Sequence, residues 1–221
     1  MSGYHTETVT LRIGGAEYRI RTLSDRQQYH DPDGSAERAG ISSATWPLFG
    51  MLWPAGLALA EEMTHVSIDG LRILEVGCGA GLSSLVLHKR GADIVASDHH
   101  PLADEFLQHN AQLNGLPPLP FQHAQWLGPN PRLGRFDLIV GSDVLYERDH
   151  PALLAGFIAA HAKPSARVLV ADPGRGHRGR FSSLMLAQGF AKSEQPFSGS
   201  TRASEPRGRI MTFSRDFAAA A

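Results

Sequence analysis

An aspartate and a tyrosine stand three residues apart, just after an apolar run in the second half of the sequence. The run is FDLIVG, residues 136–141, and the two side chains are Asp143 and Tyr146. A carboxylate there can accept hydrogen bonds from a ligand, and a phenol ring can shape a narrow channel and attract a cation. Asp143 can equally act as the N-cap of a short turn leading to Glu147, because aspartate is a favoured capping residue. The local pattern leaves an active site and a capped helix open as alternatives.

Three glycines and an acid form a second group of residues earlier in the chain. Directly after an apolar run the sequence reads G-x-G-x-G, with glycines at Gly77, Gly79 and Gly81. Glycines suit a sharp turn whose backbone approaches a ligand. Asp98 ends the next apolar run, 17 residues after Gly81, where an acid accepts hydrogen bonds from two ribose hydroxyls. The group predicts a nucleoside-containing ligand, and Leu82 at the place of the third glycine of G-x-G-x-x-G argues against NAD or FAD.

The cysteine and the histidines add no further chemistry. Cys78 is the single cysteine, so it cannot form an internal disulfide, and it fits a reducing compartment. No base is spaced to activate its thiol, so we interpret it as a small residue in a tight loop. No pair of cysteines or histidines has the spacing of zinc ligands. The sequence therefore predicts no metal site.

These residues need a scaffold in which strands and helices alternate. Apolar runs of strand type are found at residues 71–77, 93–98, near Phe121, at 136–141 and at 166–172, with two further candidates at 191–199 and 209–217. Helical patterns are found at residues 46–63, with Pro54 well placed for a first helical turn, and at residues 82–91, 101–115, 151–162 and 180–190. This alternation is typical of βαβ units and a mainly parallel sheet. In such sheets ligands bind at the carboxyl ends of the strands, so we expect Asp98 and Asp143 at one edge.

The first 45 residues are predicted to form an extension of this α/β domain. Residues 9–22 alternate apolar and polar side chains on both sides of Gly14-Gly15, which is typical of a β-hairpin. The polar, turn-rich stretch that follows is expected to be exposed or mobile. We therefore divide the chain into residues 1–45, a hairpin and a mobile segment, and residues 46–221, the α/β domain.

Composition and charge are those of an ordinary globular protein. Of the 221 residues 42% are hydrophobic and 19% are charged, and the formal net charge is −1, so no overall field draws the chain toward nucleic acid or anionic lipid. The N-terminus lacks the basic and apolar regions of a secretory signal. The most apolar run, residues 46–60, is short for a membrane span and contains two prolines. We predict a cytoplasmic protein that binds neither membrane nor nucleic acid.

Four sequence pieces together resemble one enzyme family. EVGCGAG followed by ASD resembles motif I and its acidic partner in class I S-adenosylmethionine-dependent methyltransferases. Residues 49–63 are similar to the segment before motif I in methyltransferase-like protein-lysine methyltransferases, and DLIVGSDVLYE matches their Asp-x-x-Tyr/Phe motif at Asp143 and Tyr146. VADPGRG, residues 170–176, resembles the Asp-Pro-Gly-Arg of the subset that methylates the electron-transfer flavoprotein β-subunit. The similarity covers about residues 46–190. It implies a Rossmann-like seven-stranded sheet with helices on both faces.

The resemblance also implies a cofactor, S-adenosyl-L-methionine, and residues that bind it. Gly77, Gly79 and Gly81 would form the loop under its methionine part. Glu75, the acid that leads the motif, would help orient that part. Asp98 would hold the ribose. Glu75 as an ordinary, satisfied strand acid remains the alternative.

The remaining site residues follow from the same resemblance. His99 and Trp126 would flank the adenine, and Trp53 would close the cofactor pocket from the N-terminal side. Asp143 and Tyr146 would position the methyl acceptor. Ordinary core packing is the alternative for the two tryptophans.

The acceptor predicted from the resemblance is a lysine amine of a protein substrate. A small molecule, or another protein side chain such as arginine or histidine, is the first alternative, because cofactor motifs are common to all of these enzymes. A non-catalytic cofactor-binding module is the second, and a nicotinamide oxidoreductase the third. DNA or RNA methylation is disfavoured, because no Asn/Asp-Pro-Pro-aromatic sequence follows residues 136–141 and no basic stripe is present.

Overall fold

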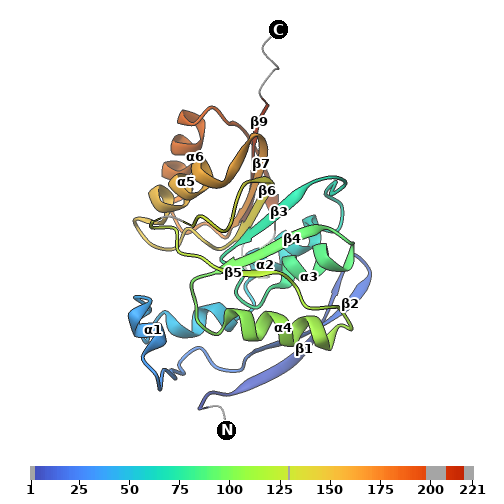
Figure 1. Ribbon diagram of the computed structural model, residues 1–221, viewed down its shortest axis with the longest axis vertical. Helices are drawn as coiled ribbons and strands as arrows, with labels where there is room; N and C mark the ends of the chain where they lie inside the picture. Colours follow the sequence, from blue (N-terminus) through green and yellow to red (C-terminus); the bar gives the residue numbers. More distant parts are fainter. Residues whose placement is uncertain (1–2, 129, 198–207, 217–221) are drawn as a thin grey trace.

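A sheet of seven strands forms the centre of the computed structural model, which describes residues 3–128, 130–197 and 208–216 (Figure 1). Its order is β5-β4-β3-β6-β7-β9-β8. The strands are β3 (Arg72–Val76), β4 (Asp93–Asp98), β5 (Phe121–His123), β6 (Phe136–Ser142), β7 (Ala162–Asp172), β8 (Ala191–Phe197) and β9 (Gly208–Arg215). The first five are parallel, and β9 is antiparallel to both β7 and β8. The predicted Rossmann-like, seven-stranded sheet is confirmed.

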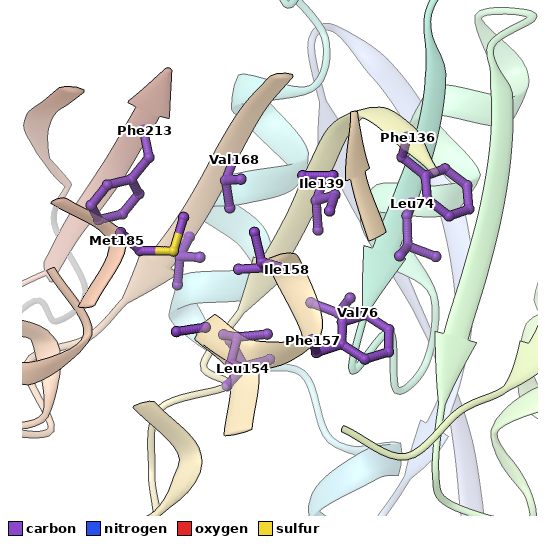
Figure 2. Close-up of a cluster of buried hydrophobic side chains, with 14 of the residues drawn as sticks. Leu74, Val76, Phe136, Ile139, Leu154, Phe157, Ile158, Val168, Met185 and Phe213 are labelled. Atoms are coloured by element: carbon purple, nitrogen blue, oxygen red, sulfur yellow. The ribbon is translucent and has the colours of Figure 1, made fainter. Parts of the chain in front are cut away.

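Helices cover both faces of this sheet, which explains why its central strands, β3, β4, β6 and β7, are mainly apolar and buried. The helices are α2 (Pro54–Glu62), α3 (Leu82–Lys89), α5 (His150–His161) and α6 (Arg178–Ala187). Successive residues of a strand point to opposite faces. In β6, Leu138 and Val140 pack with α2 and α3, and Ile139 packs with α5 and α6. Figure 2 shows this second layer, with Ile158 and Met185 among the buried side chains.

The helical pattern of residues 46–63 is divided between two helices, and the placement of Pro54 in a first helical turn is confirmed. The chain forms a 3₁₀ helix, η1 (Trp46–Gly50), and then α2, which begins at Pro54. Trp53 between them is extended, with φ −106° and ψ 145°. The ring of a proline disfavours helical geometry in the residue before it, so Pro54 can start a helix but cannot continue one. The break directs the residues before α2 toward the carboxyl edge of the sheet.

The N-terminal hairpin is present and is held by two asparagines, one within a helix and one at the C-cap of that helix. It consists of β1 (Thr6–Ile13) and β2 (Ala16–Leu23), and its neighbour is α4 (Ala103–Leu113) (Figure 1). Asn110 accepts a hydrogen bond from Arg21 N at 2.7 Å and donates one to Arg21 O at 3.2 Å. Asn114 makes the same pair of bonds with Arg19, at 2.9 and 2.8 Å. The two side-chain amides therefore satisfy the backbone of β2 in the way that a neighbouring strand would.

The stretch between hairpin and η1 contains one helical turn, α1 (Ser35–Arg38). Ala36 and Ile41 are buried there in one cluster with Trp46 and Phe106. The division at residue 45 stays a prediction.

The end of the chain forms both strands proposed for it. Residues 198, 199 and 217 of the proposed runs lie outside the described residues. None of the helices in the described part of the chain is long and apolar enough to span a bilayer.

Candidate active site

A cavity of about 370 Å³ lies at the carboxyl ends of β3, β4 and β6. Its wall includes every residue predicted for the site, namely Trp53, Glu75, Gly77, Gly79, Gly81, Asp98, His99, Trp126, Asp143 and Tyr146. This is the edge at which parallel sheets bind ligands, because backbone turns and helix N-termini face it.

The glycine loop approaches two other segments so closely that side chains would not fit. Gly77 and Gly79 have φ values of 61° and 52°, a region that glycine reaches without steric cost. A Cβ at Gly79 would lie 2.5 Å from the Phe49 carbonyl oxygen, and one at Gly77 would lie 2.9 Å from Val144 Cγ1. The glycines thus let the loop between β3 and α3 pack under the cavity.

Glu75 lies beneath this loop and holds α3. It is 2% exposed, and its Oε2 accepts hydrogen bonds from Ser84 N at 2.8 Å and from the Ser84 hydroxyl. Ser84 is in the first turn of α3, where backbone amides lack partners within the helix. Burial raises the pKa of the Glu75 carboxyl to about 7, although the Ser84 bonds act in the opposite direction. Glu75 therefore has a structural contact in addition to its place on the cavity wall.

Asp98 ties the glycine loop to the end of β4. Its Oδ2 accepts a hydrogen bond from Gly79 N at 2.9 Å, and its Oδ1 accepts one from His100 N at 2.8 Å. His99 Nδ1 lies 3.5 Å from Oδ1. An ionised carboxylate has about four acceptor positions, so capacity remains on the cavity side for the hydroxyls of a sugar.

Aromatic rings form the walls beside Asp98. Trp126 is half-buried and meets the ring of His150 edge-on, with 5.3 Å between the centroids. On the other side, His100 stacks on Phe49 with the centroids 3.6 Å apart. Burial lowers the pKa of His100 to about 3, so its ring is neutral at physiological pH. Flat rings beside a sugar-binding acid suit a nucleoside with a planar base.

Asp143 directly follows β6 and adopts an unusual backbone conformation. Its φ is 54°, the one positive value at a non-glycine residue within the described ranges. Aspartate tolerates this region better than most residues, and such strain is typical of functional sites. The interpretation of Asp143 as the N-cap of a short turn leading to Glu147 is wrong, because residues 143–147 form neither a helix nor a hydrogen-bonded turn and the next helix, α5, begins at His150.

The Asp143 carboxylate binds a guanidinium from the next strand end. Arg175 Nε donates to Asp143 Oδ1 at 2.5 Å, and Arg175 Nη2 donates to Oδ2 at 2.7 Å. Asp143 is 7% exposed. The two residues form a bidentate ion pair on the cavity wall, a geometry that fixes the plane of the carboxylate.

Tyr146 is a neutral phenol in this setting. Burial and the nearby carboxylates of Asp98, Glu147 and Asp143 raise its pKa to about 12. Its ring meets that of His150 edge-on at 4.5 Å. Tyr146 can therefore offer a ring face and a hydroxyl, whereas proton abstraction by a phenolate at neutral pH is disfavoured.

Trp53 lies on the cavity wall, at the break between η1 and α2. Its Nε1 donates a hydrogen bond to the Leu48 carbonyl at 3.0 Å. The guanidinium carbons of Arg26 and Arg175 lie 4.8 and 5.5 Å from its ring centroid. Cations over an indole face are attracted to it, so Trp53 links the segment before α2 to the Asp143 pair.

Sequence reasoning missed Phe49, His100 and His150 as cavity residues. A helical pattern over residues 46–63 gave no sign that Phe49 would face a ligand edge. His100 and His150 have no motif around them, since each acts through ring packing rather than through spacing. The position of His100, two residues beyond Asp98, was the one usable signal.

Comparison with known proteins agrees with this geometry. A family model described as "Methyltransferase domain" matches residues 52–214. The electron transfer flavoprotein beta subunit lysine methyltransferase of Rattus norvegicus is 31% identical over 203 residues, which are 85% of this chain and 75% of that protein. The protein N-lysine methyltransferase METTL21A of Danio rerio is 35% identical over 148 residues, 63% of this chain and 60% of the relative.

Solved structures show the same fold at lower identity. A T. thermophilus 16S rRNA N2 G1207 methyltransferase in complex with AdoMet and guanosine has a TM-score of 0.65 at 19% identity, covering 96% of this chain and 51% of that one. The magnesium protoporphyrin IX methyltransferase of Synechocystis with bound SAM has a TM-score of 0.57 at 19% identity, covering 73% and 78%. The glycine loop, the acid with free acceptor positions and the aromatic walls fit the same cofactor. The chain belongs to the class I S-adenosylmethionine-dependent methyltransferases, with relatives among the protein-lysine methyltransferases, and S-adenosyl-L-methionine is its cofactor.

Proposed function

We propose that this enzyme is a protein-lysine N-methyltransferase. The observation that carries the proposal is that Asp143 and Tyr146 share one cavity with the glycine loop and Asp98. An acceptor held by the first two residues would lie beside a cofactor held by the others. Relatives that are described as lysine methyltransferases support a lysine amine as the acceptor.

The cofactor would be held from three sides. The glycine loop would lie under its methionine part, and Asp98 would accept hydrogen bonds from its ribose hydroxyls. His99 and Trp126 would flank the adenine, and Trp53 would close the pocket. When bound, S-adenosylmethionine supplies an electrophilic methyl group on a sulfonium sulfur. Glu75, fixed by Ser84, would act through the position of the loop and α3.

The acceptor side would position a neutral amine rather than abstract its proton directly. A lysine amine has an ordinary pKa of about 10.4, so most of it is protonated at neutral pH and must lose a proton to water on entry. Asp143 would accept a hydrogen bond from the neutral amine, and Tyr146 would narrow the channel with its ring. Direct displacement then depends on alignment, which contributes much of the rate in reactions of this kind.

The first candidate substrate is the β subunit of electron transfer flavoprotein. Several relatives are described as lysine methyltransferases of that subunit, at about 30–32% identity to this chain. A small-molecule acceptor is the competing outcome. Location in the cytoplasm remains a prediction from the sequence.

Labelling a cell lysate tests the acceptor class directly. The lysate is incubated with the enzyme and methyl-labelled cofactor, and the labelled residue is mapped by mass spectrometry. Asp98→Asn, which removes the ribose acceptor but keeps the side-chain shape, serves as the matched control. Label on a protein lysine that appears with the native enzyme but not with Asp98→Asn supports the proposal. Label confined to small molecules, or to other side chains, contradicts it.

A further inference from the structure

Arg175 contacts Asp143 because a turn after β7 orients its side chain toward that carboxylate. Asp172, at the end of β7, is completely buried, and its Oδ1 accepts hydrogen bonds from Gly174 N at 2.7 Å and from Arg175 N at 3.4 Å. Gly174 has φ 106°, which a side-chain-bearing residue rarely adopts. The sequence Asp-Pro-Gly-Arg thus builds a turn that directs the arginine toward the end of β6.

The resulting ion pair is asymmetric in exposure. The Asp143 side chain is 5% exposed and that of Arg175 is 38% exposed. The guanidinium also lies over the Trp53 ring. Arg175 therefore covers a buried carboxylate from the solvent side, and both groups line the cavity that would receive the acceptor.

The charge of Arg175 bears on the protonation state of an incoming amine. A carboxylate without a partner attracts an ammonium ion and raises the pKa of a neighbouring amine. An ammonium has no lone pair and cannot accept a methyl group. A cation that neutralises the charge of the carboxylate removes this preference for the ammonium form. The remaining lone pairs of the carboxylate can still accept a hydrogen bond from an N–H group.

We propose that Arg175 is a positioning residue that fixes the Asp143 carboxylate and cancels its charge, so that the site holds the acceptor amine in its neutral, nucleophilic form. The inference rests on the proposed lysine acceptor. Arg175 acts through Asp143, and no covalent role is assigned to it.

Other ionisable groups face this pair, and the Arg175 variants retain all of them. They are Asp98 on β4, Glu75 on β3, Tyr146 and Glu147 after β6, His150 on α5, Asp172 on β7, Arg178 on α6 and Arg26 near Trp53. A profile measured against pH includes their titration in every variant. The comparison between variants therefore isolates the contribution of Arg175.

The test compares Arg175→Gln and Arg175→Lys with the native enzyme. Methyl transfer to the recombinant β subunit of electron transfer flavoprotein, or to the labelled lysate protein if that is the acceptor, is measured against pH. For Arg175→Gln we expect the midpoint of the rising limb to move up by about one pH unit, with Arg175→Lys in between. Arg180→Gln is the matched control. Arg180 lies five residues later, in α6, is exposed, and bonds only the Arg148 carbonyl among the contacts described.

A binding measurement separates this role from a merely structural one. With S-adenosylhomocysteine present, Arg175→Gln should bind the acceptor a few-fold more tightly at neutral pH, because it accepts the abundant ammonium form, yet transfer about tenfold more slowly. Unchanged affinity for S-adenosylhomocysteine shows that the variant is folded. An unshifted midpoint, or binding and transfer weakened together, overturns the inference. Absence of lysine label with the native enzyme overturns the proposed function, and the inference falls with it.

Discussion

Asp98 carries two tasks in one carboxylate, since it fixes the glycine loop and would accept the ribose hydroxyls. We expect Asp98→Asn to weaken binding of S-adenosylmethionine by about 10- to 100-fold, because hydrogen bonds to charged groups contribute about 1.5–3 kcal/mol each. Isothermal titration calorimetry measures this change. Asp104→Asn, an exposed acid in the first turn of α4, is the control and should bind normally. An affinity for Asp98→Asn within twofold of native would contradict our assignment.

Glu75 should make stability depend on pH in a defined direction. Its pKa in the folded chain is about 7, above the ordinary value of 4.5, so the folded state keeps a proton that the unfolded state releases. The stabilisation is therefore complete below pH 4.5 and is lost as the pH rises through about 7.

Glu75→Gln should remove this pH dependence. Between about pH 5 and about pH 8 we expect the native chain to lose on the order of 1–3 kcal/mol more of its free energy of unfolding than the variant loses. Chemical denaturation at the two pH values measures the difference. Equal losses in the two proteins would show that Glu75 is ionised in the folded chain throughout this range.

Single residues were predictable where their chemistry follows an element end. Asp98, Asp143 and the glycines were found because each comes directly after an apolar run, and parallel strand ends meet at one edge. His150 was not found, because its contacts with Trp126 and Tyr146 depend on how α5 packs. Contacts that depend on helix packing produce no recognisable spacing of residues in the sequence.

At the scale of elements, α4 connects the hairpin to the cofactor loop. Asn110 bonds β2 and also donates to the Ala80 carbonyl at 2.9 Å, within the glycine loop. Asn114, one turn later, bonds β2 but makes no described bond to that loop. The two asparagines are therefore a matched pair for separating the two contacts.

Replacing each asparagine by alanine should give different results. Asn114→Ala should expose the amide of Arg19 to hydrogen exchange and cost about 1–2 kcal/mol of stability. Asn110→Ala should cost more, because it removes the partner of three backbone groups, one of them buried and two part-buried, and should also weaken cofactor binding several-fold. Hydrogen exchange and calorimetry measure the two effects. Equal cofactor affinity in both variants would refute a link from α4 to the loop.

Element types were predictable from periodicity, whereas their connections were not. The strands and helices of the sheet follow apolar patterns that both faces of a covered sheet require. The break between η1 and α2 follows from Pro54, whose fit to a first helical turn was recognised without its effect on Trp53. In the sequence, Asn110 and Asn114 look like ordinary polar helix residues. Their contact with the hairpin, which is distant in sequence, depends on the tertiary structure.

At the scale of the whole molecule, the cofactor pocket joins segments that are far apart in the chain. Its wall includes residues from Ala39 to Arg175, so a bound ligand connects η1, the ends of β3, β4 and β6, and α5. Binding to the folded state alone stabilises it. At a cofactor concentration about 100-fold above the dissociation constant we expect a gain of about 2.7 kcal/mol.

Such a gain corresponds to a rise of about 5–10 °C in the melting temperature for a chain of this size. Differential scanning fluorimetry with and without S-adenosylmethionine measures it. NAD serves as the control ligand, because the glycine spacing disfavours it. A shift with NAD and none with S-adenosylmethionine would contradict the pocket assignment.

The central claim is that one cavity holds the cofactor with Asp98 and a protein lysine with Asp143. The most direct test measures cofactor affinity and lysine methylation in Asp143→Asn. This change keeps the side-chain shape, and asparagine tolerates the positive φ. We expect unchanged affinity for S-adenosylmethionine and a loss of lysine methylation of about 100-fold or more, because a misaligned acceptor forfeits the advantage of orientation. Lysine methylation within a few-fold of native, at unchanged cofactor affinity, would contradict the account.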